Sequence, residues 1–320
     1  MRSDTWLAVL ASGALALGAV ACGGDDEAGG GNGGGGGDES QALSGTITID
    51  GSSTVQPFAE AAAELFNEEN PGVKITVGGS GTGDGFEKFC RGETDISDAS
   101  RPIEEEETAA CKMENITATE VQVANDGVAV ITNKALSIPC AKTEELKALF
   151  ESGAKTKTYA DANPQFPAEE ISLFTPGPES GTFEFFAEEI NEQEKMQRED
   201  NVQTSSDDNV IITGVSGEEN AIGYLGFSFY EQNQDKLNVI DVDSGSGCVK
   251  PSLETIQSGE YKPLARPLFM YPSAEKAKRP EVKAFLDFAV ENHQEISEAA
   301  QIVPMTEEQA SKSKQAIEGA

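Results

Sequence analysis

The chain has 320 residues, which is enough for two ordinary lobes that each bury a hydrophobic core. It carries 56 acidic residues against 23 basic ones, which gives a formal net charge of −33 at pH 7. A chain this acidic lacks the basic surface that binds a nucleic acid backbone, so we exclude nucleic acid as a partner.

The N-terminus has the pattern of an export signal. Arg2 precedes an apolar run from Trp6 to Val20, and Cys22 follows at the position of a lipoprotein-type cysteine. The run is too short for a comfortable membrane span, and flexible glycine follows it rather than a cluster of charges. We expect residues 1–22 to be a lipoprotein signal peptide with Cys22 as the lipidation site. A plain secretory signal with a stray cysteine is the alternative, and both export the protein.

Residues 23–43 have the composition of a linker. Positions 23–37 are almost pure glycine with a few acids, so they cannot bury apolar surface and should be disordered. A linker of this length reaches on the order of 20 Å. A lipid on Cys22 would therefore hold the folded part close to the outer face of the cytoplasmic membrane, in the cell envelope or periplasm.

Beyond the linker, strand and helix patterns alternate, which predicts a mixed, mostly parallel sheet flanked by helices. At three junctions a short strand passes into a helix through a turn of glycines and hydroxyl residues: 51–54, 78–83 and 176–183. In open α/β sheets, ligands bind where such turns converge at the carboxyl ends of strands. The three turns together therefore predict one binding site.

The third turn has the chemistry of an anion site. Ser180 is a candidate N-cap, and the first N–H groups of the following helix have no partner within that helix. Gly181 lets a ligand approach the backbone, and Thr182 adds a hydroxyl. An ordinary capped helix with nothing bound is the alternative for this turn alone.

Two passages, 121–126 and 264–270, predict where the chain crosses between two lobes joined by a hinge. We expect one lobe to contain residues 44–124 and 266–320, and the other to contain residues 125–265.

Three further segments have patterns that bear on their secondary structure. We expect the four acids at 104–107 to form a solvent-exposed face at the N-terminus of a helix. Periodicity does not decide between helix and strand for 210–215. Residues 281–290 place an apolar stripe on one face of a helix, which should close on the first lobe.

Four cysteines follow Cys22, and an even number in an exported chain predicts disulfide bonds. They are Cys90, Cys111, Cys140 and Cys248. Three pairings are possible, and we favour Cys90 with Cys111 and Cys140 with Cys248, because this pairing keeps each bridge inside one lobe. The cysteines form no C-x-x-C motif and the chain has a single histidine, so we expect no metal site and no cofactor.

Five segments, taken in order, carry a family resemblance: Gly51-Ser-Ser-Thr, Gly79-Ser-Gly-Thr-Gly, Asp95-Ile-Ser-Asp-Ala-Ser-Arg-Pro, Ser180-Gly-Thr-Phe and Ala221-Ile-Gly-Tyr-Leu-Gly-Phe. They resemble the phosphate-binding proteins (the PstS family) that feed phosphate ABC transporters, in a branch with an Ala-Ser-Arg-Pro motif. The resemblance runs from about Ser44 to the C-terminal helix. It implies an α/β, two-lobed periplasmic-binding-protein fold of type II. It also implies a monomeric lipoprotein that captures inorganic phosphate and delivers it to the membrane permease subunits of an importer.

The resemblance also implies which residues hold the ligand: Ser53, Thr54, Ser80, Ser180, Gly181 and Thr182. The sequence departs from the best-known branch at two positions. Arg101 stands where that branch has the aspartate that accepts the phosphate proton, and Pro176 stands where it has an arginine. We expect Arg101 to supply the cation for phosphate; the alternative is an ion pair with a neighbouring acid such as Asp98.

The missing aspartate leaves selectivity open. Sulfate carries no proton near pH 7, so an acceptor in the site would repel it and favour phosphate. Asp84, Glu179, Asp207 and Asp208 are the nearest acids, and which of them, if any, accepts the proton is not decided by sequence.

Two other functions compete with phosphate transport. One is a receptor for sulfate, molybdate or tungstate, or a phosphate sensor or adhesin. The other is a phosphatase-like hydrolase, which we disfavour because the only histidine is His293 and no nucleophile-elbow or phosphate-loop motif is present. We therefore expect a binding protein and not an enzyme.

Overall fold

The computed structural model describes residues 42–193 and 196–320. The expected signal peptide, the lipidation site at Cys22 and nearly all of the linker lie outside the described residues. Within the described ranges, no helix combines the length and the apolar character that crossing a membrane requires.

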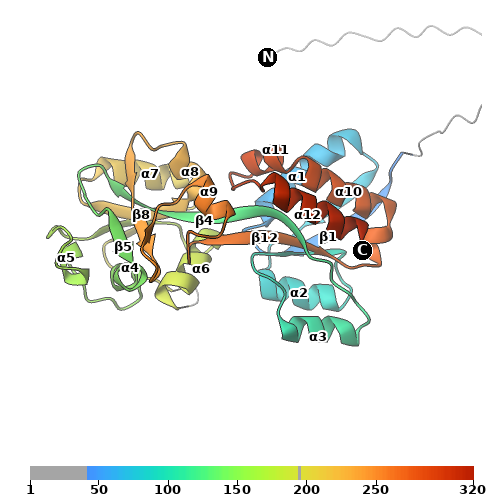
Figure 1. The fold of residues 1–320 in the computed structure, drawn as a ribbon, viewed down its shortest axis with the longest axis horizontal. Coiled ribbons are helices and arrows are strands. Elements are labelled where there is room, and N and C mark those ends of the chain that lie inside the picture. The colour runs from blue at the N-terminus through green and yellow to red at the C-terminus, as the bar shows by residue number, and fades with distance from the viewer. Residues whose placement is uncertain (1–41, 194–195) are drawn as a thin grey trace, which may run out of the picture. The chain divides into compact units, whose positions relative to one another are not determined.

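Strands and helices are interspersed along the chain (Figure 1). The strands are β1 (Gly45–Gly51), β2 (Val73–Val77), β3 (Ile96–Ala99), β4 (Val121–Asn133), β5 (Cys140–Lys142), β6 (Ser172–Thr175), β7 (Val202–Thr204), β8 (Ala221–Gly226), β9 (Leu237–Val239), β10 (Asp241–Asp243), β11 (Cys248–Val249) and β12 (Ala265–Pro272). The helices are α1 (Gln56–Glu69), α2 (Thr82–Cys90), α3 (Glu105–Met113), α4 (Thr143–Phe150), α5 (Tyr159–Ala162), α6 (Gly181–Phe186), α7 (Asp208–Gly217), α8 (Phe227–Glu231), α9 (Leu253–Gln257), α10 (Pro280–Glu291), α11 (His293–Ala299) and α12 (Glu307–Glu318). A π-helical turn, η1 (Ala187–Asn191), extends α6, and a short 3₁₀ helix, η2 (Lys276–Lys278), precedes α10.

The predicted mixed sheet is present, and both halves of the chain contribute to it. Its strand order is β2-β1-β3-β12-β4-β8-β6-β7, with β9 pairing to β4 beside this path. β1 pairs in parallel with β2 and β3, and β6 pairs in parallel with β7 and β8. β12 and β4 are antiparallel to each other and to their other neighbours. These two strands therefore join the two parallel groups into one sheet.

β4 runs without interruption through the polar residues Asn125 and Asp126 and through Gly127. The pairing with β12 extends from Met270 opposite Val121 to Ala265 opposite Gly127. A Cβ atom on Gly127 would lie 2.5 Å from Ile256 Cδ1 of α9. This glycine therefore lets α9 pack directly against the crossing strand.

The buried side chains form two large clusters, one toward each end of the crossing strands, and a smaller third cluster. In the first, Phe66 of α1 meets Phe285 of α10 with ring centroids 5.6 Å apart. In the second, Phe186 stacks on Tyr224 at 3.9 Å, and Phe150 meets Phe186 edge-on at 5.0 Å. The lobe boundaries given above remain a proposal.

Three local features differ from, or complete, the sequence expectations. Residues 210–215 lie within the helix α7, which Asp207 caps by accepting a hydrogen bond from the Asn209 N–H at 2.9 Å. The acidic run at 104–107 is not wholly a solvated face, because the Glu107 side chain is largely buried. The chain closes with three helices, α10 to α12, where the sequence indicated one.

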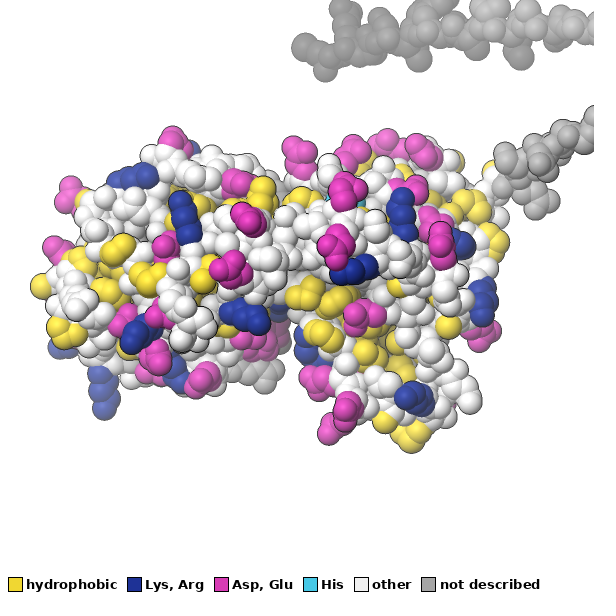
Figure 2. All heavy atoms as spheres, viewed as in Figure 1, with side chains coloured by type: hydrophobic (Ala, Val, Ile, Leu, Met, Phe, Trp, Pro, Cys, Tyr) yellow, Lys and Arg dark blue, Asp and Glu magenta, His cyan; other side chains and the backbone are white. Residues whose placement is uncertain are grey.

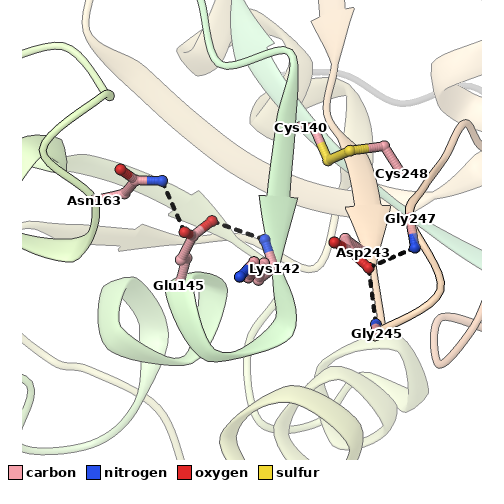
Figure 3. The surroundings of a disulfide bond; sticks show 8 residues. All are labelled: Cys140, Lys142, Glu145, Asn163, Asp243, Gly245, Gly247 and Cys248. Carbon is pink, nitrogen blue, oxygen red and sulfur yellow. Dashed lines mark hydrogen bonds between the residues drawn. A yellow bond between two sulfur atoms is a disulfide. The ribbon is translucent and has the colours of Figure 1, made fainter.

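Two disulfide bonds join the four cysteines in the pairing that the sequence analysis favours. Cys90 bonds to Cys111 and links α2 to α3, and Cys140 bonds to Cys248 and links β5 to β11 (Figure 3). The second bridge closes a loop in which Gly245 and Gly247 have φ near +107° and +105°, a conformation that favours glycine. Both glycine N–H groups donate to the Asp243 carboxylate, at 2.8 and 2.9 Å.

Phe285→Ala should lower the free energy of unfolding by roughly 3–5 kcal/mol, because it leaves a cavity among the aromatic rings of the first cluster. Urea denaturation followed by circular dichroism measures the change. Met113→Ala is the control: its side chain is 77% exposed, so the expected change is within about 0.5 kcal/mol. Equal losses in the two variants would contradict the assignment of Phe285 to the core.

Candidate functional site

The turn after β1 is held in shape by its own backbone and by β3. The Ser52 N–H donates to the Asp98 carbonyl at 2.9 Å, and the Thr54 N–H donates to Ser52 Oγ at 3.2 Å. The Val55 and Gln56 N–H groups donate to the Ser52 carbonyl, which starts α1. The turn thus presents Ser53 and Thr54 at the carboxyl end of the sheet.

The turn after β2 is built from glycine. Gly81 precedes α2 with φ near +103°, a conformation that permits the abrupt change from strand to helix. Ser80 lies in this turn, and the hydroxyl of Thr82 is 3.1 Å from that of Ser100 at the end of β3. The second turn is therefore tied to the third strand as well as to its own helix.

The turn after β6 has the cap that the sequence predicts. Ser180 Oγ accepts a hydrogen bond from the Thr182 N–H at 3.2 Å, and α6 starts at Gly181. A Cβ atom on Gly181 would lie 2.4 Å from Thr54 Oγ1 and 3.1 Å from Ser53 Oγ. The backbone of the third turn therefore lies directly against the first turn, and the glycine makes this approach possible.

A cleft of about 640 Å³ opens beside this contact. From the first lobe it is lined by Ser53, Thr54, Ser80 and Arg101, four of the residues expected to bind the ligand. Gly181 touches Ser53 and Thr54, with Ser180 and Thr182 on either side of it, but these three residues are not among those that line the cleft. The structure thus brings the third turn into contact with the first, and it places Ser80 and Arg101 on the wall of the cleft that the first turn lines.

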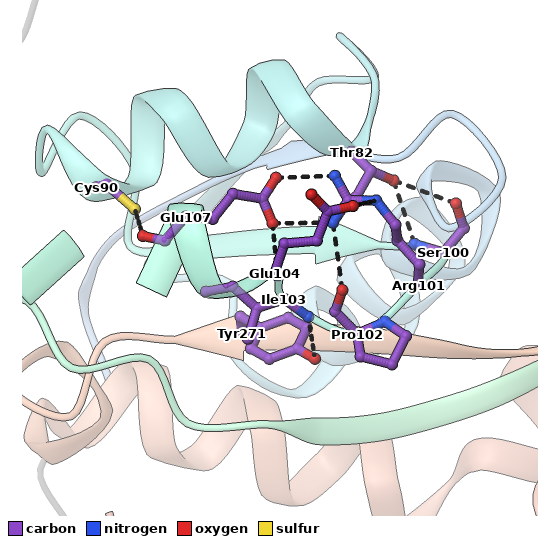
Figure 4. A network of polar contacts seen from close by, with 9 residues as sticks. All are labelled: Thr82, Cys90, Ser100, Arg101, Pro102, Ile103, Glu104, Glu107 and Tyr271. Atoms are coloured by element: carbon purple, nitrogen blue, oxygen red, sulfur yellow. Dashed lines mark hydrogen bonds and ion pairs between the residues drawn. The ribbon is translucent and has the colours of Figure 1, made fainter. Parts of the chain in front are cut away.

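Arg101 lines the cleft, but its guanidinium already has partners (Figure 4). It pairs with both carboxylate oxygens of Glu107, at 2.9 and 2.8 Å, and its Nε lies 3.3 Å from Glu104 Oε1. Burial raises the pKa of Glu107, but the hydrogen bonds from Arg101 and from the Glu104 N–H outweigh it and leave that pKa below its usual value. The acidic partner of Arg101 is therefore Glu107, whereas Asp98 was the alternative suggested by sequence.

Arg266 is the residue that the sequence analysis missed. Its Nη2 donates to Thr54 Oγ1 at 2.9 Å, and its Nε lies 3.2 Å from Asp126 Oδ2. The guanidinium carbon lies 3.7 Å from the centroid of the Phe185 ring, within range of a cation–π interaction. The side chain is only 13% exposed and lines the cleft. Arg266 therefore places a buried positive charge where the first turn, the crossing strands and α6 meet.

The sequence around Arg266 gave little indication that this residue belongs to the binding site. It lies in the return strand between Ala265 and Pro267, outside every motif that suggested the site. The absence of an arginine at position 176 was the one indication that a cation had to come from elsewhere.

The cleft also contains carboxylates. Asp84 lines it, whereas Glu179, Asp207 and Asp208 do not. Burial raises the pKa of Asp208 to about 6, but this residue lies outside the cleft. Glu189 of η1 lines the cleft as well. Burial raises the pKa of Glu189, and the charge of Arg266 opposes this rise. Among the four acids suggested by sequence, Asp84 is therefore the one placed where it could face a ligand.

Comparison with known proteins identifies the family of the chain. Residues 36–293 match the model of the PBP superfamily domain. The phosphate-binding protein PstS of Staphylococcus saprophyticus is 42% identical over 246 residues, which cover 76% of this chain and 74% of that protein.

Solved structures give the same result. A possible phosphate-binding protein from Planctomyces limnophilus superposes with a TM-score of 0.82 at 38% identity, covering 87% of this chain and 99% of that one. A phosphate ABC transporter substrate-binding protein from Clostridium perfringens, solved with bound phosphate, superposes with a TM-score of 0.57 at 27% identity, covering 82% and 100%. The chain belongs to the PBP superfamily and, within it, to the family of phosphate-binding proteins.

Proposed function

We propose that this protein captures inorganic phosphate outside the cytoplasm and delivers it, chemically unaltered, to the membrane subunits of an ABC importer. The observation that carries the proposal is the contact between Gly181 of one lobe and Thr54 of the other, beside the cleft that Arg266 lines. Hydroxyl-bearing turns from both lobes and a buried cation can then surround one small anion.

The donor set suits phosphate. Phosphate has four oxygens that need many hydrogen bonds, and hydroxyl and N–H groups supply them without excess charge. We assign Ser53, Thr54 and Ser80 in the first lobe, and Ser180, Gly181 and Thr182 in the second, to this role. Hydrogen bonds to a charged partner contribute roughly 1.5–3 kcal/mol each. A handful of them can reach the −8 kcal/mol or so of a micromolar complex after the cost of ordering.

Arg266 is a better candidate for the phosphate-binding cation than Arg101, which the sequence led us to expect in that role. A guanidinium can donate two parallel hydrogen bonds to an oxyanion. Arg266 already donates to the first turn, whereas Arg101 would have to leave its paired contacts with Glu107 before it could reach the ligand. We therefore propose that Arg266 makes the main electrostatic contribution to phosphate binding and that Arg101, on the wall of the cleft, makes a smaller one.

The location of the only histidine favours a protein that binds its ligand without catalysing a reaction. His293 is buried in α11, and it does not line the cleft. The cleft thus offers no imidazole base beside its serine and threonine hydroxyls, which a serine hydrolase of the usual type requires. The family relationship supports the same reading, since the relative from Staphylococcus saprophyticus is named a phosphate-binding protein and the structure from Clostridium perfringens a transporter substrate-binding protein.

Membrane attachment completes the proposal. The lipoprotein-type cysteine at position 22 and the glycine-rich segment after it would hold the protein, as a monomer, near the importer. The acidic side chains on the visible face of the folded part are spread over both lobes and form no single patch (Figure 2). Screening limits each of them to about 8 Å at physiological salt, so they need not oppose anion capture.

Isothermal titration calorimetry of protein stripped of bound anion tests the function. We expect phosphate to bind at one site with a Kd in or below the micromolar range, about −8 kcal/mol or stronger. We expect sulfate to bind at least about tenfold more weakly if an acid such as Asp84 accepts the phosphate proton. Equal affinities would overturn the selectivity, absence of phosphate binding would overturn the function, and release of phosphate from a generic ester would favour the hydrolase.

Arg266→Met should weaken phosphate binding by about a hundredfold or more, because it removes a buried donor of charge-assisted hydrogen bonds. Methionine is an unbranched side chain that keeps part of the length of arginine. Arg101→Met should weaken binding less, by about tenfold at most, since Glu107 already occupies that guanidinium. Calorimetry gives both affinities, and thermal unfolding of each variant checks that the fold is retained. A larger loss in the Arg101 variant would return the main role to Arg101.

Gly181→Ala should weaken phosphate binding by about tenfold or more, because the added methyl group would meet Thr54 Oγ1 and force the two turns apart. Gly83→Ala is the matched control, since Gly83 lines the same cleft and a Cβ atom there meets nothing within 4 Å. Equal affinities in these two variants would show that the close contact between the turns does not matter for binding.

A further inference from the structure

The carboxylate of Asp50, at the end of β1, uses its two oxygens for different purposes. Oδ1 accepts two backbone hydrogen bonds, from the Gly51 N–H at 2.8 Å and from the Ser80 N–H at 3.0 Å. Oδ2 accepts a hydrogen bond from Lys88 Nζ of α2. One side chain thus joins the first turn, the second turn and the helix that follows the second turn.

The second turn is packed closely around this carboxylate. A Cβ atom on Gly78 would lie 2.9 Å from Asp50 Cγ, and the Gly78 N–H donates to the Ile49 carbonyl at 2.9 Å. The Gly81 N–H donates to the Gly51 carbonyl at 2.8 Å. The position of Ser80 relative to the first turn therefore depends on contacts that centre on Asp50.

Asp50 also places a negative charge beside the proposed anion site. Burial raises its pKa, but the hydrogen bonds from Lys88 and from the Ser80 and Gly51 N–H groups outweigh burial and bring that pKa below its usual value. Lys88 is the cation that faces it, with Asp84 and Glu93 as more distant acidic neighbours of Lys88.

A second acid lies beneath the first turn. Asp98 of β3 stands in register with Gly51 and is fully buried. Burial, and then the charge of Asp50, raise the pKa of Asp98 well above its usual value. Both effects act against the charged form of Asp98.

We infer that Asp50 and Lys88 are positioning residues for phosphate binding. Asp50 Oδ1 fixes the first and second turns relative to each other, and Lys88 neutralises the charge that Asp50 would otherwise direct against the bound anion. The inference rests on the proposed function. It adds that the ligand-binding turns depend on an ion pair that itself makes no contact with the ligand.

The two roles of Asp50 can be separated by substitution. Asparagine keeps an oxygen at the Oδ1 position for the Gly51 and Ser80 N–H groups and removes the negative charge. Alanine removes both. If the ion pair only held α2 against β1, loss of Lys88 would weaken binding by destabilising the fold. The double variant that also removes the charge of Asp50 would then bind phosphate no better than the variant that lacks Lys88 alone.

The test compares phosphate Kd values, measured by calorimetry at low and high salt, for Lys88→Met, Asp50→Asn/Lys88→Met, Asp50→Ala and Asp50→Ala/Lys88→Met. Lys88→Met should bind at least about tenfold more weakly at low salt, with a smaller loss at high salt because ions screen the unpaired carboxylate. Asp50→Asn/Lys88→Met should return to within about threefold of the parent protein. Asp50→Ala should bind at least about tenfold more weakly, and adding Lys88→Met should not restore it.

Lys314→Met is the control for losing a lysine of an ion pair, since Lys314 pairs with Glu291 at 3.0 Å outside the cleft. It should bind phosphate like the parent protein. Urea unfolding of every variant separates a change in affinity from a loss of fold. The inference is overturned if Lys88→Met binds like the parent, or if the Asn/Met double variant binds no better than Lys88→Met. Failure of the parent protein to bind phosphate would instead overturn the proposed function.

Discussion

The antiparallel pairing of β4 with β12 is the interaction on which the site depends. It carries the chain between the lobes in both directions and sets Arg266 directly opposite Asp126. Because neighbouring residues of a strand point to opposite faces of a sheet, a slip of one residue would turn Arg266 away from the first turn. The register therefore decides whether the cleft receives a cation. The same guanidinium contacts Thr54 in the turn after β1 and Phe185 in α6, the helix that follows β6.

The pairing also limits how the lobes can move. The sheet is continuous through the crossing strands, so closure on a ligand has to bend these strands without breaking the hydrogen bonds between them. The register shift between Leu268 and Phe269 is an irregularity of the kind that lets paired strands bend. Behind the crossing, Asn125 and Gln309 exchange side-chain hydrogen bonds, and Gln309 also donates to the Gln257 carbonyl. This network links the second lobe to the last helix, α12, and adds a contact that any bending must accommodate.

Local patterns were sufficient for those parts of the site that are built from consecutive residues. Ser180 follows a strand and precedes an apolar helical stripe, so its capping role was predictable. The disulfide pairs followed from assigning the cysteines to lobes. The role of Arg266 depends on pairing between strands separated by about 140 residues, and no short pattern records such a register. Glu107 was placed with exposed acids because the run 104–107 has no apolar residue, yet the start of α3 turns its side chain toward Arg101.

Three acids near the cleft are offset by cations of their own, so the net charge of −33 overstates the negative charge that a bound anion would meet, although Asp84 and Glu189 also line the cleft. Asp126 pairs with Arg266, Asp50 pairs with Lys88, and Glu107 pairs with Arg101. Each pair is a few ångströms across, so well beyond that distance its two charges largely cancel, whereas an anion in direct contact with Arg266 still interacts mainly with the guanidinium. The ligand then experiences mainly the oriented hydroxyl and N–H groups of the turns and whichever guanidinium can reach it. Charge balance within each pair, rather than the sum over the chain, therefore determines whether a phosphate dianion is attracted.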